Sequence, residues 1–245
     1  MIKRDFINLL VNKAENHIIT DLRLGHAYCC VEIDNDKLGL AYTPKELTND
    51  CCSGLGGELY IGQTADKLIL NLGDDNRILS CAALASVNAL INISLPDLIT
   101  GDITDIIHLK PTDNIAMIGY FSPLVKTLSK KSNKLCIFEK KTSDNFLPIE
   151  QLENLISEFQ VALISATSII DNSIDVLLEI TRNCNEVVIL GPSTPLSKEV
   201  FSKYNVTLLS GMIPVSNTQL KQLISHGYGT RSFKETVKKV SLRIK

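Results

Sequence analysis

The sequence predicts an α/β protein in which a small α+β module precedes a five-stranded parallel sheet. Two observations carry this prediction. From residue 115 onward, short apolar segments typical of buried strands alternate with helical stretches. Before residue 92, a segment of alternating polarity is followed by a helix rich in small residues. Strands and helices that alternate with short connections are typical of parallel sheets with right-handed crossovers and helices on both faces.

The N-terminal module begins with an amphipathic helix over residues 2–17. Residues 25–43 alternate in polarity around the turn Asp34-Asn35-Asp36-Lys37, which predicts a β-hairpin. Residues 76–91 form a helix whose small side chains allow close backbone approach, so we expect it to cross the hairpin. Asn88 lies near its end among apolar neighbours and needs a hydrogen-bond partner, which is either backbone or ligand.

Residues 93–110 are interpreted as a linker, because Pro96, Gly101 and three aspartates interrupt the helical pattern. The module then spans residues 1–92 and the ligand-binding domain residues 111–245. Within that domain we expect strands at 115–120, 135–138, 161–164, 187–190 and 207–209, and helices at 123–132, 149–159, 173–184, 195–204 and 217–226. The basic segment 233–245 is predicted to be an amphipathic helix that docks on the sheet or on a second subunit of a homo-oligomer.

Composition restricts the function classes. The chain has 245 residues, 44% of them hydrophobic, and a formal net charge of -2. Because there is no basic field, nucleic acid and acidic lipid are disfavoured as partners. No apolar run approaches the roughly 18 residues of a membrane span, and the first ten residues are too polar for a secretory signal. We therefore expect a cytoplasmic protein whose seven cysteines are reduced thiols.

The turn after the fourth expected strand is a candidate ligand site. Gly191 frees the turn, Pro192 stiffens it, Ser193 or Thr194 can cap the exposed amides, and Pro195 suits the first helical position. A helix start of this kind favours an anionic or polar group through its dipole and amide donors. The alternative is an ordinary capped turn without a ligand.

A second turn of similar build follows the first expected strand, with Gly119, Tyr120 and Phe121 before Ser122-Pro123. If the strand order is 3-2-1-4-5, the first and fourth strands flank the crevice at which open α/β sheets bind ligands. Both turns would then face one site. Asn88 or the Gly54–Gly57 loop is expected to close that site from the N-terminal side.

Glu139 ends the second expected strand, about twenty residues after the first turn, where nucleotide-binding sheets hold ribose hydroxyls. The first turn lacks G-x-G-x-x-G, so a dinucleotide is disfavoured while an adenosyl or flat heterocyclic ligand stays open. The alternative is a solvated strand end paired with Lys140 or Lys141.

Several segments together resemble the putative heavy-metal chelation family: Ile118-Gly119-Tyr120-Phe121, Phe138-Glu139, Ser165-Ala166-Thr167, Val188-Ile189-Leu190-Gly191-Pro192-Ser193, Pro195-Leu196-Ser197 and Gly211. The resemblance implies an enolase-N-terminal-like module joined to a Rossmann-like domain, and it adds Thr167 to the candidate site. It further implies metal handling, a methyltransferase likeness and flavin- or pterin-like ligands. One departure is Asp171-Asn172-Ser173, where the family pattern has Asn-Gly-Thr, and this puts a ligand contact there in doubt.

No metal motif is legible in the residues. C-x-x-C, H-E-x-x-H and H-x-x-H are absent, and Cys29 and Cys30 would point to opposite faces of a strand. We therefore expect no preformed metal site, and any metal would arrive through a bound chelator.

Two functions remain at this stage. In the first, the chain binds a small anionic or heterocyclic molecule, such as a metal chelate or a pterin or flavin derivative, between its two parts. In the second, it is a transferase or lyase that binds adenosylmethionine at Gly119 and Glu139.

Overall fold

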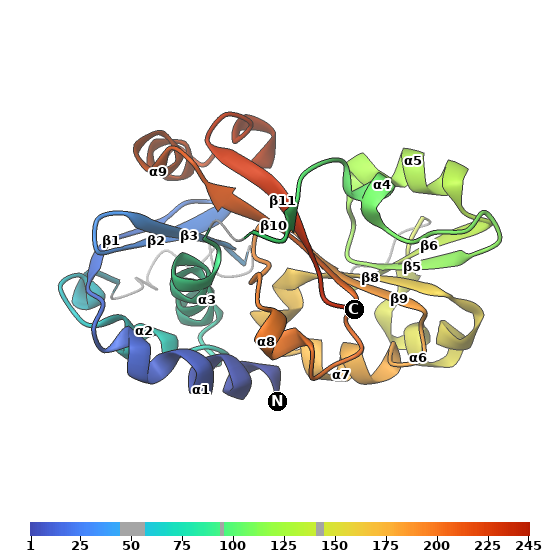
Figure 1. Cartoon of the computed structure of the whole chain (residues 1–245), viewed down its shortest axis with the longest axis horizontal. Coiled ribbons are helices and arrows are strands. Elements are labelled where there is room, and N and C mark those ends of the chain that lie inside the picture. The colour runs from blue at the N-terminus through green and yellow to red at the C-terminus, as the bar shows by residue number, and fades with distance from the viewer. Residues whose placement is uncertain (45–56, 94–95, 141–144) are drawn as a thin grey trace.

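The computed structural model describes residues 1–44, 57–93, 96–140 and 145–245. Two sheets organise these residues, a three-stranded antiparallel sheet and an eight-stranded, mostly parallel one (Figure 1). The α/β prediction is confirmed, and the expected five parallel strands are extended to eight by strands at both edges.

The three-stranded sheet has the order β1-β2-β3, and its strands are β1 (Ile19–Leu24), β2 (Tyr28–Ile33) and β3 (Lys37–Tyr42). Strands β2 and β3 are the predicted hairpin, and Asp34 and Asn35 in its turn have φ values of 55° and 64°. Asx residues tolerate this left-handed region better than most, so the turn sequence fits its geometry. β1 was not expected.

Helices cover both faces of this small sheet (Figure 1). One face packs on α1 (Ile2–Ala14), α2 (Ala65–Ile69) and α3 (Arg77–Ile91). The other face contributes Cys30, Leu38 and Leu40 to a separate cluster with α9 (Asn217–Ser225), which comes from the far end of the chain. This double coverage explains why β2 is buried along almost its whole length.

Helix α3 lies against β2 and β3 as its small residues predicted. A Cβ built on Gly39 of β3 would overlap the carbonyl oxygen of Ala85 and the amide nitrogen of Ala89. Only glycine therefore permits this approach of strand and helix. The helix begins after Asn76, whose side chain accepts hydrogen bonds from the amides of Ile78 and Leu79.

The large sheet has the strand order β4-β11-β10-β9-β8-β5-β6-β7, parallel from β10 to β7 and antiparallel at β4 and β11. Its strands are β4 (Leu98–Ile99), β5 (Asn114–Ile118), β6 (Lys134–Glu139), β7 (Leu147–Pro148), β8 (Val161–Ser165), β9 (Glu186–Leu190), β10 (Leu208–Pro214) and β11 (Val237–Arg243).

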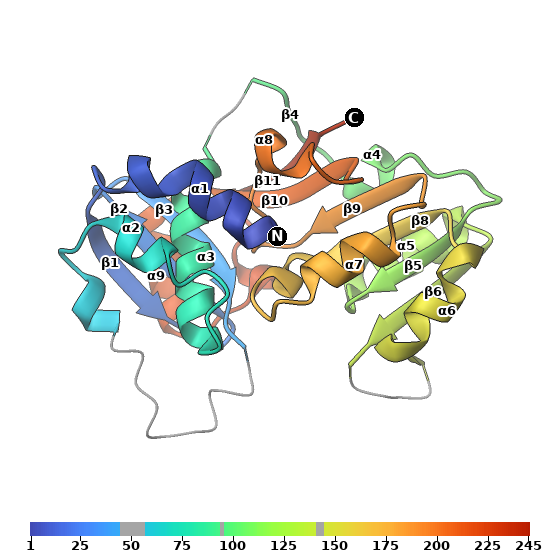
Figure 2. The ribbon, with the colours of Figure 1, turned by 90° about the horizontal axis from the view of Figure 1, so that it is seen from below.

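Helices cover both faces of this sheet as well (Figure 2). The α-helices of this part, besides α9, are α4 (Ile103–Ile106), α5 (Ser122–Lys131), α6 (Leu152–Leu155), α7 (Ile174–Ile180) and α8 (Lys198–Phe201). The expected helix 149–159 is divided into α6 and two 3-10 turns, Ile149–Gln151 and Ile156–Glu158. The expected helix 195–204 begins only at Lys198, because Ser197 rather than Ser193 or Thr194 caps it.

Two further expectations differ from the structure. The segment 233–245 is not a helix: β11 pairs antiparallel with β10 along seven residues, and it buries Val240 and Leu242. The expected linker 93–110 contains β4, which pairs with β11, and α4.

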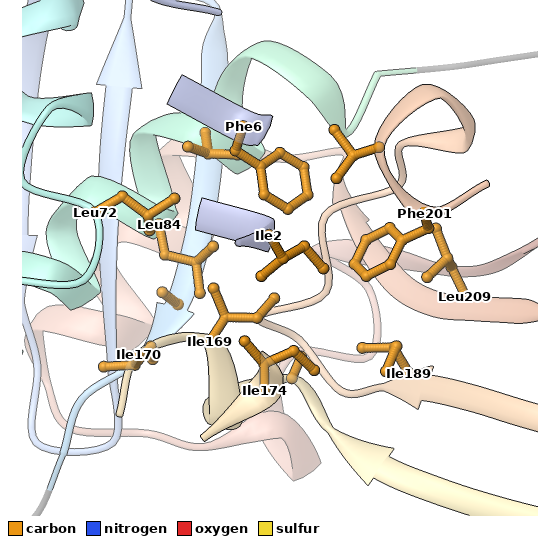
Figure 3. Packing of buried hydrophobic residues seen from close by; sticks show 14 of the residues in the cluster. Ile2, Phe6, Leu72, Leu84, Ile169, Ile170, Ile174, Ile189, Phe201 and Leu209 are labelled. Carbon is orange, nitrogen blue, oxygen red and sulfur yellow. The ribbon is translucent and has the colours of Figure 1, made fainter. Parts of the chain in front are cut away.

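One hydrophobic core joins the N-terminal part of the chain, which holds the three-stranded sheet, to the part that holds the eight-stranded sheet (Figure 3). The rings of Phe6 on α1 and Phe201 on α8 meet edge to face with centroids 5.7 Å apart. Ile2, Ile174 and Ile189 pack around them, so residues from the first helix, α7 and β9 share one apolar interior. The two parts are thus held together by packing as well as by the chain connection.

Candidate functional site

The strand order decides where the carboxyl ends of the parallel strands meet. From β5 the sheet continues to β6 on one side and to β8, β9 and β10 on the other. In chain order these five strands read 2-1-3-4-5, so the condition under which the Gly119 and Gly191 turns would flank one crevice, the order 3-2-1-4-5, is not met. The order reverses between the first and third strands, β5 and β8, and this is the position at which doubly wound sheets open a crevice.

A pocket of about 550 Å³ lies at this position, and we call it the switch-point pocket. Its floor comes from residues at or just after the carboxyl ends of three neighbouring strands: Gly119, Tyr120 and Phe121 after β5, Glu139 and Lys140 at the end of β6, and Ser165, Thr167 and Ser168 at the end of β8. Five of the ten predicted site residues line it, namely Gly119, Tyr120, Phe121, Glu139 and Thr167.

The N-terminal part supplies another wall. Tyr28 and Tyr42 lie opposite one another on β2 and β3, with ring centroids 6.0 Å apart, and Arg77 begins α3. From the part that holds the eight-stranded sheet, the Tyr120 ring meets Phe146 with centroids 5.0 Å apart, and both line the pocket. Aromatic side chains from both parts of the chain therefore line one pocket, the arrangement favoured for small-molecule sites at domain interfaces.

Burial raises the pKa of Tyr28 to about 12, and the nearby Tyr42 adds to the shift. The Tyr28 hydroxyl therefore keeps its proton at neutral pH. A protonated phenol both donates and accepts a hydrogen bond.

The turn after β5 depends on glycine. Gly119 has φ 97°, and a Cβ built on it would lie 2.9 Å from Cβ of Ser165. Its amide donates to the carbonyl oxygen of Phe138 at 3.0 Å. The next amide, that of Tyr120, donates to Oε1 of Glu139 at 2.8 Å. Glu139 thus fixes this turn by accepting from the backbone.

The expected alternative partner of Glu139, Lys140, is engaged elsewhere. Its ammonium group pairs with Asp171, a pocket residue that follows β8 in the sequence. Its backbone amide donates to Oε2 of Glu139 at 3.3 Å. Lys141 lies outside the described residues. Glu139, Asp171, Lys140 and Arg77 together give the pocket lining two acidic and two basic groups.

Hydroxyl groups line the pocket at the carboxyl end of β8. Oγ of Ser165 and Oγ1 of Thr167 are 2.9 Å apart, and the Ser168 hydroxyl donates to the carbonyl oxygen of Ser165 at 2.7 Å. Ser165, Ser168, Tyr28, Tyr42 and Arg77 were missed as site residues. The sequence does indicate Ser165 as a site residue, since it is a polar residue at the end of an apolar strand. For Tyr28 and Tyr42, the alternating pattern predicts only positions in the hairpin.

The departure at Asp171-Asn172-Ser173 lies beside the pocket. Asp171 and Ser173 line it, and Oδ1 of Asp171 accepts from the amide and hydroxyl of Ser173 at 3.1 and 2.6 Å. Asn172 has φ 67°, the left-handed region that glycine adopts freely and asparagine tolerates. The local backbone thus accommodates either residue.

The Gly191 turn does not reach the pocket. Ser193 is 1% exposed and Thr194 is 0% exposed, because the N-terminal part covers both. Oγ of Ser193 accepts from the amide of Tyr42 at 2.8 Å. Gly191 and Pro192 belong to the same turn and do not line the pocket.

Asn88 finds backbone partners at this junction. Its Nδ2 donates to the carbonyl oxygens of Leu40 at 2.7 Å and Ser193 at 3.1 Å. One turn later, Asn92 donates to the carbonyl oxygen of Thr194 at 2.9 Å and accepts from the Leu196 amide at 2.8 Å. The end of α3 is thus fastened to the Gly191 turn by side-chain amides.

Two further expectations concern metal and membrane. Among the residues that the structure describes, no three His, Cys, Asp or Glu side chains lie together as metal ligands. Cys51, Cys52 and the Gly54–Gly56 part of the expected loop lie outside those residues. No helix in the described ranges is both long and apolar enough to cross a membrane.

The fold and the sequence of the chain are similar to those of known proteins. The present chain superimposes on a DUF364-family protein of unknown function from Pyrococcus horikoshii with a TM-score of 0.87, at 21% identity over 99% of this chain and 100% of the other. A DUF364-family protein of unknown function from Desulfitobacterium hafniense gives a TM-score of 0.83, at 18% identity over 98% of each chain. An uncharacterized protein of Methanocaldococcus jannaschii is 24% identical over 99% of this chain and 96% of its own length.

The sequence also matches the models of two protein families, which have the same description. Residues 7–91 match DUF4213 and residues 102–243 match DUF364, each described as "Putative heavy-metal chelation". The two matches together span most of the chain. The chain belongs to the "Putative heavy-metal chelation" family.

Proposed function

We propose that the chain binds a small heterocyclic molecule in the switch-point pocket and acts in heavy-metal handling through that molecule. The observation that carries the proposal is the pocket itself. It has a volume of about 550 Å³, within the usual range for small-molecule sites, and lies where the strand order reverses. Both parts of the chain are needed to form it.

The lining favours a flat ring. Tyr28 and Tyr42 come from the N-terminal part and Tyr120 and Phe146 from the rest of the chain, and aromatic faces attract planar ligands through stacking or edge contacts. Tyr120 keeps 49% of its surface exposed, so its ring is available to a ligand.

The polar groups favour a ligand with both donors and acceptors. The hydroxyls of Ser165, Thr167 and Ser168 can act in either sense, and Glu139 and Asp171 accept. Because acidic and basic groups balance around the pocket, a heterocycle of low net charge suits it better than a polyanion. Pterin and flavin rings have this combination of planarity and alternating donors and acceptors.

Metal enters this proposal as cargo of the bound molecule. The described residues contain no cluster of three metal ligands, whereas a heterocycle with adjacent nitrogen and oxygen atoms can itself chelate an ion. The pocket would then recognise the chelate through its organic part.

A second candidate is a transferase that uses adenosylmethionine. One observation favours it: Glu139 ends β6, lines the pocket and accepts a hydrogen bond from the Tyr120 amide, and the end of this strand is where nucleotide-binding sheets hold ribose hydroxyls. The same binding experiment separates the two candidates.

The test begins with the protein as purified. Mass spectrometry of the denatured supernatant identifies any small molecule that copurifies, and elemental analysis of the same sample measures metal per chain. Isothermal titration with 6-carboxypterin, riboflavin and adenosylmethionine follows. We expect one of the two heterocycles to bind at micromolar concentration, and the transferase candidate is rejected if adenosylmethionine does not bind below millimolar.

Two glycine variants locate the site. Gly119→Ala and Gly191→Ala both place a side chain at positive φ, 97° and 118°, so they share the backbone penalty. Only Gly119 lines the pocket, and its new Cβ would press on Ser165, whereas the Cβ at Gly191 would lie 3.8 Å from Phe121. We expect at least about tenfold weaker binding for Gly119→Ala and less than about twofold for Gly191→Ala. Equal losses for the two variants would place the ligand elsewhere.

A further inference from the structure

Two cysteine sulfur atoms meet inside the N-terminal part. Cys29 lies on β2 and Cys81 on α3, and their Sγ atoms are 2.7 Å apart. Both residues are 0% exposed. This separation is shorter than ordinary contact of two sulfur atoms and about 0.65 Å longer than the roughly 2.05 Å of a covalent S–S bond.

The pairing is selective among the five described cysteines. Cys30 is the immediate neighbour of Cys29, but side chains alternate along a strand, and Cys30 points to the opposite face, towards the cluster around α9. Cys136 and Cys184 lie in the other part of the chain, near β6 and β9. Among the cysteines that the structure describes, Cys29 and Cys81 alone are brought into contact, one from a strand and one from a helix.

We propose that Cys29 and Cys81 are a modification site, a dithiol that is converted to an internal disulfide by a peroxide. The thiolate of one cysteine attacks a peroxide oxygen; an S–O bond forms, the O–O bond breaks and hydroxide leaves. The second thiolate attacks that sulfur, so the S–S bond forms and the S–O bond breaks with loss of a second hydroxide. Overall, two thiols and one hydrogen peroxide give one disulfide and two waters.

The surroundings set the rate of this reaction. Burial, together with the adjacent Cys81 thiol, raises the pKa of Cys29, so little thiolate is present at neutral pH. Oxidation therefore requires transient opening between α3 and the hairpin, and it is slower than that of an exposed thiol. Once the first sulfur is oxidised, the second is already in place and no large movement is needed.

The bond would join two elements that line the switch-point pocket. Tyr28 precedes Cys29 on β2, and Arg77 precedes Cys81 by one helical turn on α3. The proposal rests on the thiol geometry and does not depend on the identity of the ligand in that pocket.

The test is a disulfide map of the full chain. The purified protein is reduced, freed of reductant and incubated with hydrogen peroxide at pH 8; remaining thiols are then alkylated in denaturant and the digest is analysed by mass spectrometry. We expect the Cys29 and Cys81 peptides to be recovered linked, with the linkage reversed by dithiothreitol. Because the map uses the unaltered chain, it does not depend on whether a cysteine variant folds.

Two variants serve as matched controls. Cys30→Ser leaves the linkage intact, since that side chain faces away, whereas Cys81→Ser abolishes it. A Cys51→Ser, Cys52→Ser double variant also retains it. Recovery of Cys29 and Cys81 as alkylated thiols after other cysteines have oxidised overturns the proposal, as does linkage of Cys29 to any other cysteine.

Discussion

Ser193 is predicted to be a structural residue whose replacement weakens folding. Its hydroxyl oxygen accepts a hydrogen bond from the Tyr42 amide at 2.8 Å, across the junction between the hairpin and the Gly191 turn. Ser193 is buried in this junction, with 1% of its surface exposed. In Ser193→Ala the Tyr42 amide loses the acceptor that the hydroxyl provides.

The size of the effect follows from the asymmetry of buried hydrogen bonds. Removing one partner costs about 1–3 kcal/mol, because the remaining group keeps its desolvation penalty. With a urea m-value of roughly 3 kcal/mol/M, a loss of about 2 kcal/mol lowers the unfolding midpoint by about 0.7 M.

Thr194→Val supplies a matched control one residue further on. Thr194 is 0% exposed, and its Oγ1 has no hydrogen-bond partner among the described residues. Replacing an unpartnered buried hydroxyl by a methyl group of similar shape removes a penalty, so we expect stability equal to the parent or higher by up to about 1 kcal/mol.

Urea unfolding followed by circular dichroism measures both variants, and titration with whichever probe binds the parent measures the pocket. The reasoning predicts a lower midpoint for Ser193→Ala, an unchanged or higher one for Thr194→Val, and ligand affinity within about twofold of the parent once Ser193→Ala is folded. An unchanged midpoint together with a large loss of affinity for Ser193→Ala would refute it and return the Gly191 turn to the ligand site.

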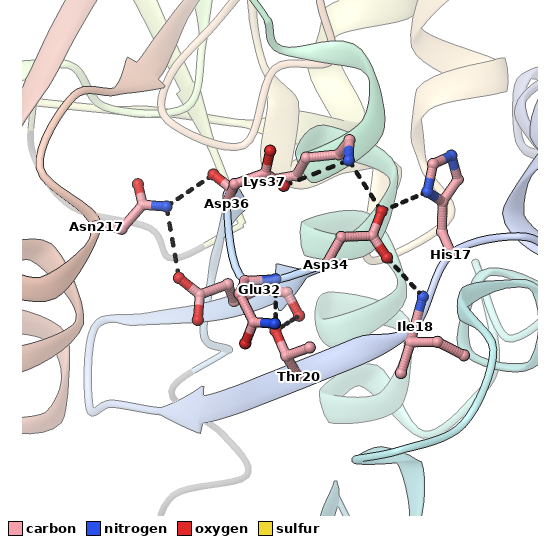
Figure 4. Close-up of polar contacts among 9 residues, drawn as sticks. His17, Ile18, Thr20, Glu32, Asp34, Asp36, Lys37 and Asn217 are labelled. Carbon is pink, nitrogen blue, oxygen red and sulfur yellow. Dashed lines mark hydrogen bonds and ion pairs between the residues drawn. The ribbon is translucent and has the colours of Figure 1, made fainter.

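Three further predictions follow from other parts of the structure. Gly39→Ala should lower the free energy of unfolding by about 3 kcal/mol, because the new methyl group meets the backbone of α3, whereas Gly229→Ala, with no atom within 4 Å of the new Cβ, should be neutral in the same denaturation assay. Lys221→Met should lower the free energy of unfolding by about 3–5 kcal/mol, since the Lys221 ammonium lies 2.7 Å from Glu32 and 3.0 Å from Asp21. In a double-mutant cycle, adding Glu32→Gln should recover part of that loss, and strictly additive effects would contradict the coupling. Burial disfavours the charged form of Asp34, but hydrogen bonds from Lys37, the Ile18 amide and His17 outweigh it and lower the pKa of Asp34 to about 2 (Figure 4). The difference in free energy of unfolding between the parent and Asp34→Asn should therefore be full above about pH 4 and vanish as the pH falls towards about 2. A difference that stays constant over this pH range would refute the prediction.

The polar contacts around Asp34 and Glu32 also show how the end of the chain is tied to its beginning (Figure 4). Asn217, the first residue of α9, donates to Oε1 of Glu32 at 3.4 Å and to the carbonyl oxygen of Asp36 at 2.8 Å. These bonds seat α9 on the hairpin. A sequence pattern contains no sign of such contacts, because residues almost two hundred positions apart make them.

Local pattern was sufficient for elements whose burial is periodic. In α1 every fourth residue from Ile2 to Ala14 is buried, and in α3 the small residues mark the close approach to Gly39. The hairpin followed from its alternation and its Asx turn. In each case the signal lies within about fifteen consecutive residues.

The C-terminal segment shows where such a pattern is ambiguous. Val237, Val240 and Ile244 have helical spacing, while Val240 and Leu242 also alternate as in a strand. The edge of β10 decides between them, since β11 supplies partners for its unpaired backbone groups. Tertiary pairing thus overrides the helical reading.

Strand order was the decisive quantity that local pattern did not contain. A right-handed crossover can carry the chain from β6 either outward, to the edge beyond β6, or back past β5 to the free side of that strand, and both choices satisfy the connection rules. In the structure β8 takes the place beside β5, which separates β9 from the switch point by one strand. The pair of turns expected to share one site is thereby divided.

That division gives the two similar glycine turns different tasks. Both begin at a positive-φ glycine, Gly119 or Gly191, at the carboxyl end of a parallel strand. The turn at Gly119 opens into the pocket and is fixed by Glu139. The turn at Gly191 receives the hairpin amide of Tyr42 and the side-chain amide of Asn88. Because Tyr42 lines the pocket and its amide donates to Ser193 of the Gly191 turn, the second turn helps to position the part of the pocket wall that the hairpin supplies.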